Sequence, residues 1–363
     1  MTGGIIVDQD PFKEYLIQTE PNKRDKGYAW HTAIGLQAVD GLKPSKHLLD
    51  TAIQNIEGQI SLDEAQRLLD AYYEENPRTD ETVRTEEADK VSVRIAKLLS
   101  EKAFSFTPNE YLSIHRKLFA GIYGHAGKIR DYNITKKEWV LDGETVLYGS
   151  ASELRATLEY DFSQEKNYSY KGLSMDEIIH HLAIFVSRLW QIHIFGEGNT
   201  RTTAVFFIKY LRTLGFDATN DIFAENAWYF RNALVRANYN NLTKGIHETT
   251  EYLELFLENL LCDKHHELHN RTLHVSGRYK HDQKPDIDIW EIYGESLEAF
   301  TSKTLAHIQN MYNSLGVNVV FGRSDMQKIT KLGASRASDL LKDLVHAQII
   351  EAVSGLGKGK YRF

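Results

Sequence analysis

The strongest apolar pattern in the chain lies between Met175 and Ile192. Hydrophobic residues recur there at spacings of four and three, at Ile178, Leu182, Phe185, Leu189 and Ile192. This spacing places them on one face of an α-helix. Ile179, Val186 and Trp190 extend the apolar surface around the side, so we expect a central, buried helix.

Similar helical patterns occupy much of the remaining chain. We expect helices over residues 46–75, 89–104, 107–122, 202–214, 224–241 and 247–261. The first pattern is interrupted at Gly58, and Ser61 followed by Glu64 predicts a capping box where the next helix begins. The charged stretch from Asn76 to Lys90 predicts a loop.

A different pattern runs from Lys128 to Tyr148. β-Branched and aromatic residues are frequent in this segment, and Asp142–Gly143 in its middle is a hairpin turn signal. We therefore expect a short β-hairpin within an otherwise helical region.

The end of the chain predicts a helix, a glycine turn, a second helix and two short strands joined by GLGKGK. This is the element order of a winged helix-turn-helix. Over residues 321–363, eight Lys and Arg stand against four Asp and Glu, a net charge of +4. Arg336 would lie on the second helix, and Lys358, Lys360 and Arg362 on the wing. Such a surface suits DNA, although modules of this kind also dock proteins.

These patterns predict four parts of the chain. They are an N-terminal helical region (1–106), a helical core (107–262), a linker (263–286) and the winged helix-turn-helix (287–363). The linker is polar, has no apolar period and contains His265, His266, His269, His274 and His281. A metal-binding tract is one interpretation of these histidines. No carboxylate or cysteine completes a closed site, so we prefer a solvated hinge.

Composition narrows the class of protein. The 363 residues carry a formal charge of −7, so any contact with nucleic acid must be a local patch. Cys262 is the only cysteine, which rules out an internal disulfide and favours a reducing compartment. The N-terminus does not resemble a signal peptide, and no apolar run approaches the ~18 residues of a membrane helix. We expect a mostly helical, cytoplasmic protein without a membrane segment.

Candidate chemistry is concentrated in HIFGEGNTR, which runs from His193 to Arg201 between two apolar helices. The first backbone N–H groups of the second helix have no intrahelical partner, and the helix dipole favours an anion there. Gly196 and Gly198 allow a sharp turn and close approach to a ligand. Asn199 could add a donor or a cap, and Arg201 could hold a phosphate.

Two further residues fit the same site. Glu197 would repel phosphate directly, but it makes sense as a ligand for a magnesium ion that bridges phosphate oxygens. His193 would be a base that faces the same cavity. Each residue alone is more often a surface group or a helix cap, whereas a nucleotide site explains all of them together.

HIFGEGNTR resembles the signature of the Fic family, H-x-F-x-[D/E]-G-N-G-R-x-x-R. The matching positions are His193, Phe195, Glu197, Gly198, Asn199 and Arg201. The flanking long helices and the upstream hairpin agree with the family as well, and the resemblance extends over about residues 45–260. It implies an all-α fold, a Fic-type helical bundle with a β-hairpin flap, followed by a C-terminal winged helix-turn-helix, which often accompanies this family.

The resemblance also implies an activity, namely a protein adenylyltransferase (AMPylator) that uses ATP and Mg²⁺. His193 would deprotonate a Ser, Thr or Tyr hydroxyl of a target protein, which then attacks the α-phosphorus while pyrophosphate leaves. Glu197 would bind Mg²⁺, and Arg201 would hold the β-phosphate. An anion hole would consist of Gly198, Asn199 and the amide of Thr200. Phe195 would pack inward and fix the loop.

Other roles carried over from the family concern the nucleotide and the target. The flap residues implied to lie over both are Lys136, Lys137, Glu138 and Trp139. The flap would pin an extended segment of the target by strand addition. Asn238, in LVRAN, falls where the family often contacts the adenine.

The chain departs from the family pattern at two positions. Thr200 replaces the usual glycine, which keeps the N–H but crowds the cavity, and Ala204 stands where a second arginine belongs. In the family that arginine grips the γ-phosphate and pairs with an inhibitory glutamate. NIEGQISLDEAQRLL resembles the surroundings of that glutamate, so Glu57 would be the inhibitory residue, although Ile53 replaces the expected Ser or Thr. The alternative for Glu57 is a surface carboxylate at a helix end.

Three functions remain open on the sequence alone. The first is an adenylyltransferase that acts on protein hydroxyls, its own included, and is restrained by Glu57. The second is a DNA-binding regulator in which the Fic-like part senses nucleotides with little turnover. The third is a Fic enzyme with another donor, such as UTP, GTP or CDP-choline. The sequence is also compatible with a homodimer.

Overall fold

The structure, a computed structural model, describes residues 12, 21–76, 80–218, 222–276, 289, 293–297, 300–315, 319–353 and 359–363. The chain forms two compact units. The first comprises Met1–Lys136 and Thr145–Leu268, and the second Lys137–Glu144 and His269–Phe363. The predicted regions 1–106 and 107–262 thus lie in the same unit except for the short segment 137–144.

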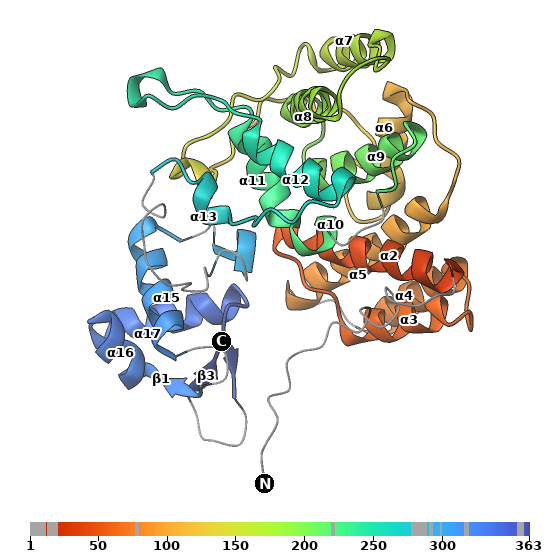
Figure 1. Cartoon of the computed structure of the whole chain (residues 1–363). Coiled ribbons are helices and arrows are strands. Elements are labelled where there is room, and N and C mark those ends of the chain that lie inside the picture. The colour runs from red at the N-terminus through yellow and green to blue at the C-terminus, as the bar shows by residue number, and fades with distance from the viewer. Residues whose placement is uncertain are drawn as a thin grey trace. The chain divides into compact units, whose positions relative to one another are not determined.

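The first unit begins with a layer of helices. They are α2 (Pro21–Gly35), η1 (Leu36–Asp40), α3 (Lys46–Ile56), α4 (Leu62–Glu75) and α5 (Asp80–Ser100). α5 packs against both α2 and α4, as Figure 1 shows. The capping box predicted for α4 is confirmed, because Ser61 Oγ accepts from the Glu64 N–H and the Glu64 carboxylate accepts from the Ser61 N–H. Such a box satisfies backbone donors that a helix start would otherwise leave unpaired.

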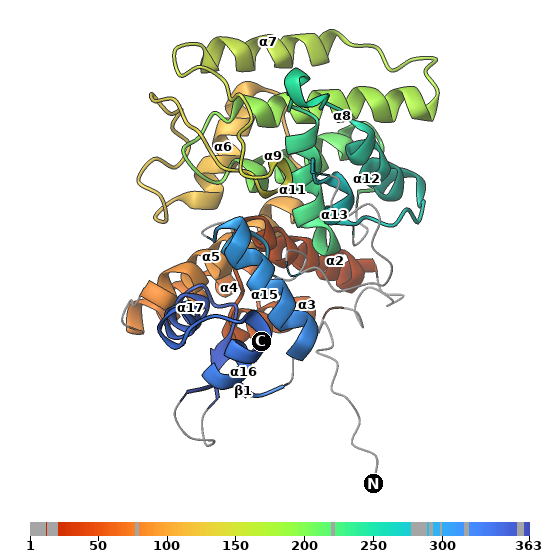
Figure 2. The ribbon, with the colours of Figure 1, turned by 90° about the vertical axis from the view of Figure 1, so that its left-hand side faces the viewer.

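The second layer of this unit carries the candidate site. It contains α6 (Pro108–Phe119), α7 (Leu154–Asn167), α8 (Met175–Ile192), α9 (Asn199–Thr213), α10 (Ile222–Glu225), α11 (Ala227–Arg236), η3 (Leu242–Lys244) and α12 (Glu251–Cys262). The central helix predicted over Met175–Ile192 is confirmed with the same bounds. α8 lies against α7, α9, α11 and α12, and Figure 2 shows α7 alongside it.

Two sequence expectations are wrong. Asn76–Lys90 is not a loop, because α5 already begins at Asp80. Its Glu, Lys and Arg residues are good helix formers, and no apolar stripe marks the helix before Ala88. The β-hairpin expected over 128–148 has no strands: the chain reverses through η2 (Trp139–Leu141) and Asp142–Gly143. The turn is closed by backbone hydrogen bonds, including one from the Glu138 N–H to the Glu144 carbonyl at 2.9 Å.

The second unit combines η2 with the C-terminal elements. These are α13 (Asn270–Leu273), η4 (Gly294–Leu297), α15 (Ser302–Leu315), β1 (Phe321–Gly322), α16 (Arg323–Thr330), α17 (Ala334–His346), β2 (Glu351–Ala352) and β3 (Lys360–Arg362). β3 lies between β1 and β2, antiparallel to both, with Phe321 opposite Tyr361 and Glu351 opposite Arg362. Lys358 and most of the predicted wing lie outside the described residues, as do residues 277–286 of the predicted linker.

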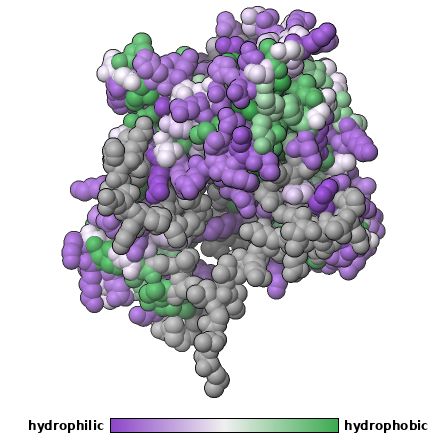
Figure 3. All heavy atoms as spheres, in the orientation of Figure 1, coloured by the Kyte–Doolittle hydropathy of each residue, from purple (hydrophilic) through white to green (hydrophobic). Residues whose placement is uncertain are grey.

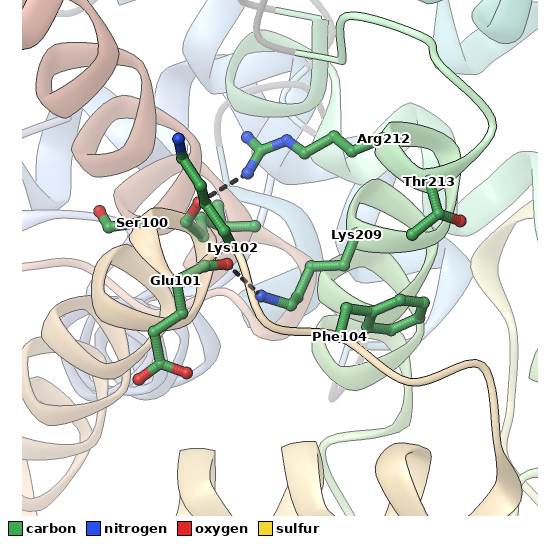
Figure 4. Close-up of a pocket in the computed structure, with 8 residues that line it drawn as sticks. Ser100, Glu101, Lys102, Phe104, Lys209, Arg212 and Thr213 are labelled. Atoms are coloured by element: carbon green, nitrogen blue, oxygen red, sulfur yellow. Dashed lines mark hydrogen bonds between the residues drawn. The ribbon is translucent and has the colours of Figure 1, made fainter.

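Hydrogen bonds join α5 and α9 at the C-terminal ends of both helices. Lys209 Nζ donates to the carbonyls of Leu98 and Glu101 at 2.7 and 2.6 Å, and Arg212 Nη1 donates to that of Leu99 at 2.6 Å. These cations cap the C-terminus of α5, where the helix dipole favours positive charge. They line a cavity of about 190 Å³ (Figure 4) to which no residue of 193–201 contributes.

Hydrophilic side chains dominate the face drawn in Figure 3, with smaller hydrophobic areas between them. Large apolar side chains are exposed at scattered positions, among them Leu68, Val83, Leu147, Tyr160 and Leu242. In the part of the chain that the structure describes, no helix combines the length and the apolar character needed to cross a bilayer.

Candidate active site

The candidate site is the loop that joins α8 to α9. α8 ends at Ile192 and is capped by His193, whose backbone is left-handed (φ 48°, ψ 54°) and whose N–H bonds to the Trp190 carbonyl at 3.0 Å. A non-glycine residue in this conformation costs about 1 kcal/mol or more, so surrounding contacts must hold it. α9 begins after Gly198, also left-handed, where an added Cβ would lie 2.4 Å from the Phe119 ring. Only glycine fits there.

The His193 imidazole is buried and unpaired. The residue is 3% exposed, and its ring packs against Tyr148 and Trp190 at centroid distances of 4.4 and 5.2 Å. Within the described part of the chain, neither Nδ1 nor Nε2 has a hydrogen-bond partner. Burial first, and then the nearby charges of Lys136, Arg231 and Arg130, hold the His193 pKa well below 6.5. The ring is therefore neutral at pH 7 and retains a lone pair that could accept a proton.

Phe195 and Asn199 fix the loop. Phe195 is fully buried and stacks on His115, with ring centroids 3.7 Å apart and planes 11° apart. The Asn199 side chain accepts from the Phe195 N–H at 3.0 Å and donates to the Phe195 carbonyl at 2.9 Å. Because both the oxygen and the nitrogen of the Asn199 side chain bond to the Phe195 backbone, this side chain fastens the loop.

His115 supports the loop from α6. Its Nδ1 accepts from the Gly127 N–H at 2.8 Å, so Nε2 carries the proton and donates to the Glu197 carbonyl at 2.9 Å. Burial is the largest cause that lowers the pKa of His115, to about 4. The neutral ring is thus built into the loop as both donor and acceptor.

The first turn of α9 presents unpaired backbone donors. Among the described residues, no hydrogen bond uses the N–H groups of Asn199, Thr200 or Arg201, and Gly198 supplies no side-chain cap. The Thr200 hydroxyl accepts from Trp190 Nε1 at 3.0 Å, so it faces α8. These amides, next to the unpaired His193 ring, form an arrangement suited to an anion.

Glu197 is the most open carboxylate of the loop. Its side chain is 54% exposed and forms an ion pair with Lys136, whose Nζ lies 3.1 Å from Oε2. Lys136 also belongs to the first unit, just before the turn. The structure thus brings together His193, Glu197, Lys136 and the start of α9.

Arg201 does not point into an open phosphate site. It is 1% exposed, forms ion pairs with Asp40 and Glu87, and bonds to Gln37 and Tyr123 at 3.0 and 3.2 Å. Burial alone would lower its pKa, but the charges of Asp40, Tyr123 and Glu87 raise it above the ordinary value. Two carboxylates thus neutralise Arg201 in this structure, and its role in holding a phosphate stays a prediction.

Glu57 pairs with a cation of the N-terminal helices. It caps the C-terminus of α3, and its Oε2 lies 2.9 Å from Lys23 Nζ. The carboxylates that reach Arg201 are Asp40 and Glu87.

The remaining predicted residues have structural contacts. Asn238 Nδ2 donates to the carbonyls of Ser187 and Leu234 at 3.0 and 2.9 Å, which fixes the end of α11 against α8. Lys137, Glu138 and Trp139 belong to the second unit. There the Trp139 ring meets the His274 ring at 4.9 Å, while Lys137 is exposed.

Sequence reasoning missed the residues that surround the loop. They are Asp40, Glu87, His115, Tyr123 and Arg130. Each is distant in sequence from the residue that it contacts, and no local pattern marks it. Glu87 was missed because the charged segment around it was predicted to be a loop.

The chain was compared with curated proteins and with solved structures. No curated protein matches the chain. Among solved structures, the N-terminal FIC domain of the Bep8 effector protein from Bartonella sp. 1-1C is 17% identical with a TM-score of 0.39, covering 52% of this chain and 88% of that one. A Fic family protein from Desulfovibrio desulfuricans G20 is 13% identical with a TM-score of 0.38, covering 92% and 87%.

The family model for the Fic/DOC family matches residues 105–211. This segment extends from just before α6 to the last turn of α9 and includes the whole His193–Arg201 loop. The unit that presents the unpaired His193 imidazole therefore contains, over residues 105–211, a Fic/DOC family domain.

Proposed function

We propose that this protein transfers AMP from ATP to a Ser, Thr or Tyr hydroxyl of a protein, itself included. The observation that carries the proposal is the juxtaposition of two unsatisfied features in one loop. Among the residues that the structure describes, the buried His193 ring has no hydrogen-bond partner at either nitrogen, and the backbone N–H groups that open α9 have no acceptor. A phosphate beside a hydroxyl nucleophile would satisfy both features.

The residues present fit ATP and Mg²⁺ in part. The backbone N–H groups of Asn199 and Thr200 suit phosphate oxygens, and the exposed Glu197 carboxylate suits a hard cation. No group of three metal-ligating side chains occurs in the described residues, so Mg²⁺ would depend on Glu197 together with phosphate oxygens. Arg201 would fit a phosphate only when it exchanges Asp40 or Glu87 for that ligand.

In the proposed reaction His193 is the general base. It takes the proton from the target hydroxyl, whose oxygen then bonds to the α-phosphorus of ATP while the bond to pyrophosphate breaks. The amides of α9 stabilise the charge that develops on the phosphate oxygens. Lys136, released from Glu197, would remain near the nucleotide, and Asn238 would border the adenine.

Two restraints on the reaction follow from the contacts described above. The Asp40 and Glu87 carboxylates compete with phosphate for Arg201. We also keep Glu57 as an inhibitory residue in this proposal, with Lys23 as the partner that holds it.

For the C-terminal elements we infer a winged helix-turn-helix, because α15, β1, α16, α17, β2 and β3 follow in that order with β3 central in the sheet. The local charge of +4 over residues 321–363 favours DNA as its partner. This supports a second candidate function, a DNA-binding regulator whose Fic part senses nucleotides. Protein docking is the other use of such a module.

The deciding experiment is intact-mass and peptide mass spectrometry of the full chain incubated with Mg²⁺ and, separately, ATP, GTP, UTP and CDP-choline. We expect an AMP adduct on Ser, Thr or Tyr that His193→Ala abolishes. An adduct from another nucleotide alone would replace ATP as the donor. No adduct together with strong, salt-dependent gel shifts of genomic DNA would favour the regulator.

A further inference from the structure

We propose that Arg130 is the positioning residue of this site: one buried guanidinium fixes the backbone of His193 and joins it to both ends of the segment 132–149. Arg130 lies in KIRDYN, before the turn, and no sequence motif singled it out. The inference rests on the proposed role of His193 as the base.

The first part of the case is the bond to His193 itself. Arg130 Nε donates to the His193 carbonyl at 2.7 Å, and Nη2 lies 3.4 Å from the Ile192 carbonyl. The Arg130 N–H also donates to the Ile194 carbonyl at 3.0 Å. The Ile192 and His193 carbonyls lie at the C-terminal end of α8, where a helix leaves acceptors unpaired and its dipole favours a cation. Arg130 thus supports the left-handed conformation that directs the imidazole.

The second part is the bond to the segment that follows Arg130. Nη1 donates to the Tyr132 carbonyl, and Nη2 donates to the Gly149 carbonyl at 2.6 Å. Gly149 approaches α8 closely, because an added Cβ would lie 2.9 Å from the Ile192 carbonyl. Between these two anchors the segment carries Tyr148, whose ring packs on His193. A displacement of the segment would therefore reach the imidazole by two routes.

The geometry requires arginine. Its planar fork offers five donors in fixed directions, whereas the lysine ammonium is a compact charge on a flexible stem. Arg130 is 5% exposed, so its surroundings leave little room for water to replace a lost bond. A lysine at this position could keep the charge but could not hold the carbonyls of Tyr132, His193 and Gly149 at once.

The test compares Arg130→Lys with Arg94→Lys in the full chain. Arg94 is a matched control, because its Nη1 donates to the carbonyls of Leu118 and Ala120 at the end of α6, at 2.8 and 2.9 Å. Two readouts are used. One is kcat and KM for ATP. The other is the NMR signal of the ¹³C-labelled His193 ring, assigned with His193→Ala and followed through pH.

We expect Arg130→Lys to lower kcat by about 10- to 100-fold with little change in KM, because the base is displaced while the nucleotide site stays. The His193 signal should shift and broaden, with Lys136 and Arg231 remaining as the other cations near the ring. Arg94→Lys should leave both readouts unchanged.

Two results would overturn the proposal: a His193 signal identical to wild type in Arg130→Lys, or equal losses in both variants. If the wild-type protein transfers no nucleotide, the proposed function fails, and the NMR comparison alone decides whether Arg130 positions His193. If Arg130→Lys does not fold, Arg130→Gln, which retains a planar donor group, is measured in the same way.

Discussion

Arg201 Nη2 lies 2.7 Å from Glu87 Oε1, and Tyr123 donates its hydroxyl proton to the same oxygen at 2.5 Å. Asp40 pairs with Arg201 from η1. The N-terminal layer thus supplies two carboxylates to the arginine in the first turn of α9, beside the backbone N–H groups proposed to hold phosphate. These carboxylates and a phosphate would compete for one guanidinium.

The first prediction concerns this competition. Glu87→Gln should tighten ATP binding on the order of tenfold, which is about 1.4 kcal/mol, because one anionic rival of phosphate is removed. The same change should lower the unfolding free energy by up to about 3 kcal/mol, since a buried ion pair is broken. Isothermal titration calorimetry and thermal unfolding measure the two effects.

Glu86→Gln is the matched control for this prediction. Glu86 is the neighbouring buried carboxylate on α5 and pairs with Lys90 at 2.9 Å. It should lose stability without gaining affinity for ATP. Weaker ATP binding in Glu87→Gln than in wild type would show that Glu87 is not a competitor.

The second prediction concerns the pH dependence of transfer. Only the neutral imidazole can accept a proton, and the His193 pKa is lowered, so the neutral form persists below pH 6.5. The acid limb of kcat/KM should therefore lie below pH 6.5. Lys136→Gln removes a positive charge near the ring and should move this limb to higher pH. A limb that stays in place in Lys136→Gln, or that lies above pH 6.5 in wild type, contradicts the assignment of His193 as the base.

The third prediction concerns stability in acid. The pKa of His115 is about 4 in the folded protein and about 6.5 when unfolded, so between these values the unfolded state binds more protons. The unfolding free energy should therefore fall as pH drops from 6.5 to 4, by about 3 kcal/mol from this group. His115→Gln should flatten this part of the curve in urea unfolding. His180→Gln, at an exposed ring that pairs with Glu254, should not.

The fourth prediction concerns Glu57. If Glu57 restrains the enzyme, Glu57→Gly should label itself with radioactive ATP more strongly than wild type. Lys23→Ala removes the ion pair with Glu57 but keeps the Glu57 carboxylate, and so separates the effect of the ion pair from that of the residue itself. Labelling of Glu57→Gly no stronger than wild type would leave Asp40 and Glu87 as the remaining candidates for restraint.

Local patterns were sufficient for the elements of the site but not for its contacts. The helix Met175–Ile192, the capping box at Ser61 and the loop His193–Arg201 each depend on residues within a few positions of one another, so period and spacing reveal them. The residues that hydrogen-bond to the Arg201 side chain and to the His193 carbonyl lie 63 to 164 positions away in the sequence. Such pairings are set by the packing of whole helices.

Local residue composition gave the wrong secondary structure for two segments. Asn76–Lys90 is so polar that it resembles a solvated loop, yet Glu86 and Asp89 are buried within α5 and Glu87 pairs with Arg201. The β-branched residues of 128–148 favour strands. However, Arg130 donates to the carbonyls of Tyr132 and Gly149, which in a hairpin would accept hydrogen bonds from the neighbouring strand.

The caps that Lys209 and Arg212 place on the end of α5 limit how the site could open. These hydrogen bonds hold the C-terminal end of α5 against α9. Glu87 lies thirteen residues before Ser100, the last residue of α5, which is about 20 Å along the helix axis. Glu87 could then separate from Arg201 if α5 rotates as a rigid body about its capped C-terminal end. A rotation of a few degrees about that end would move the Glu87 carboxylate beyond hydrogen-bonding distance of Arg201, while the hydrogen bonds of Lys209 and Arg212 hardly change.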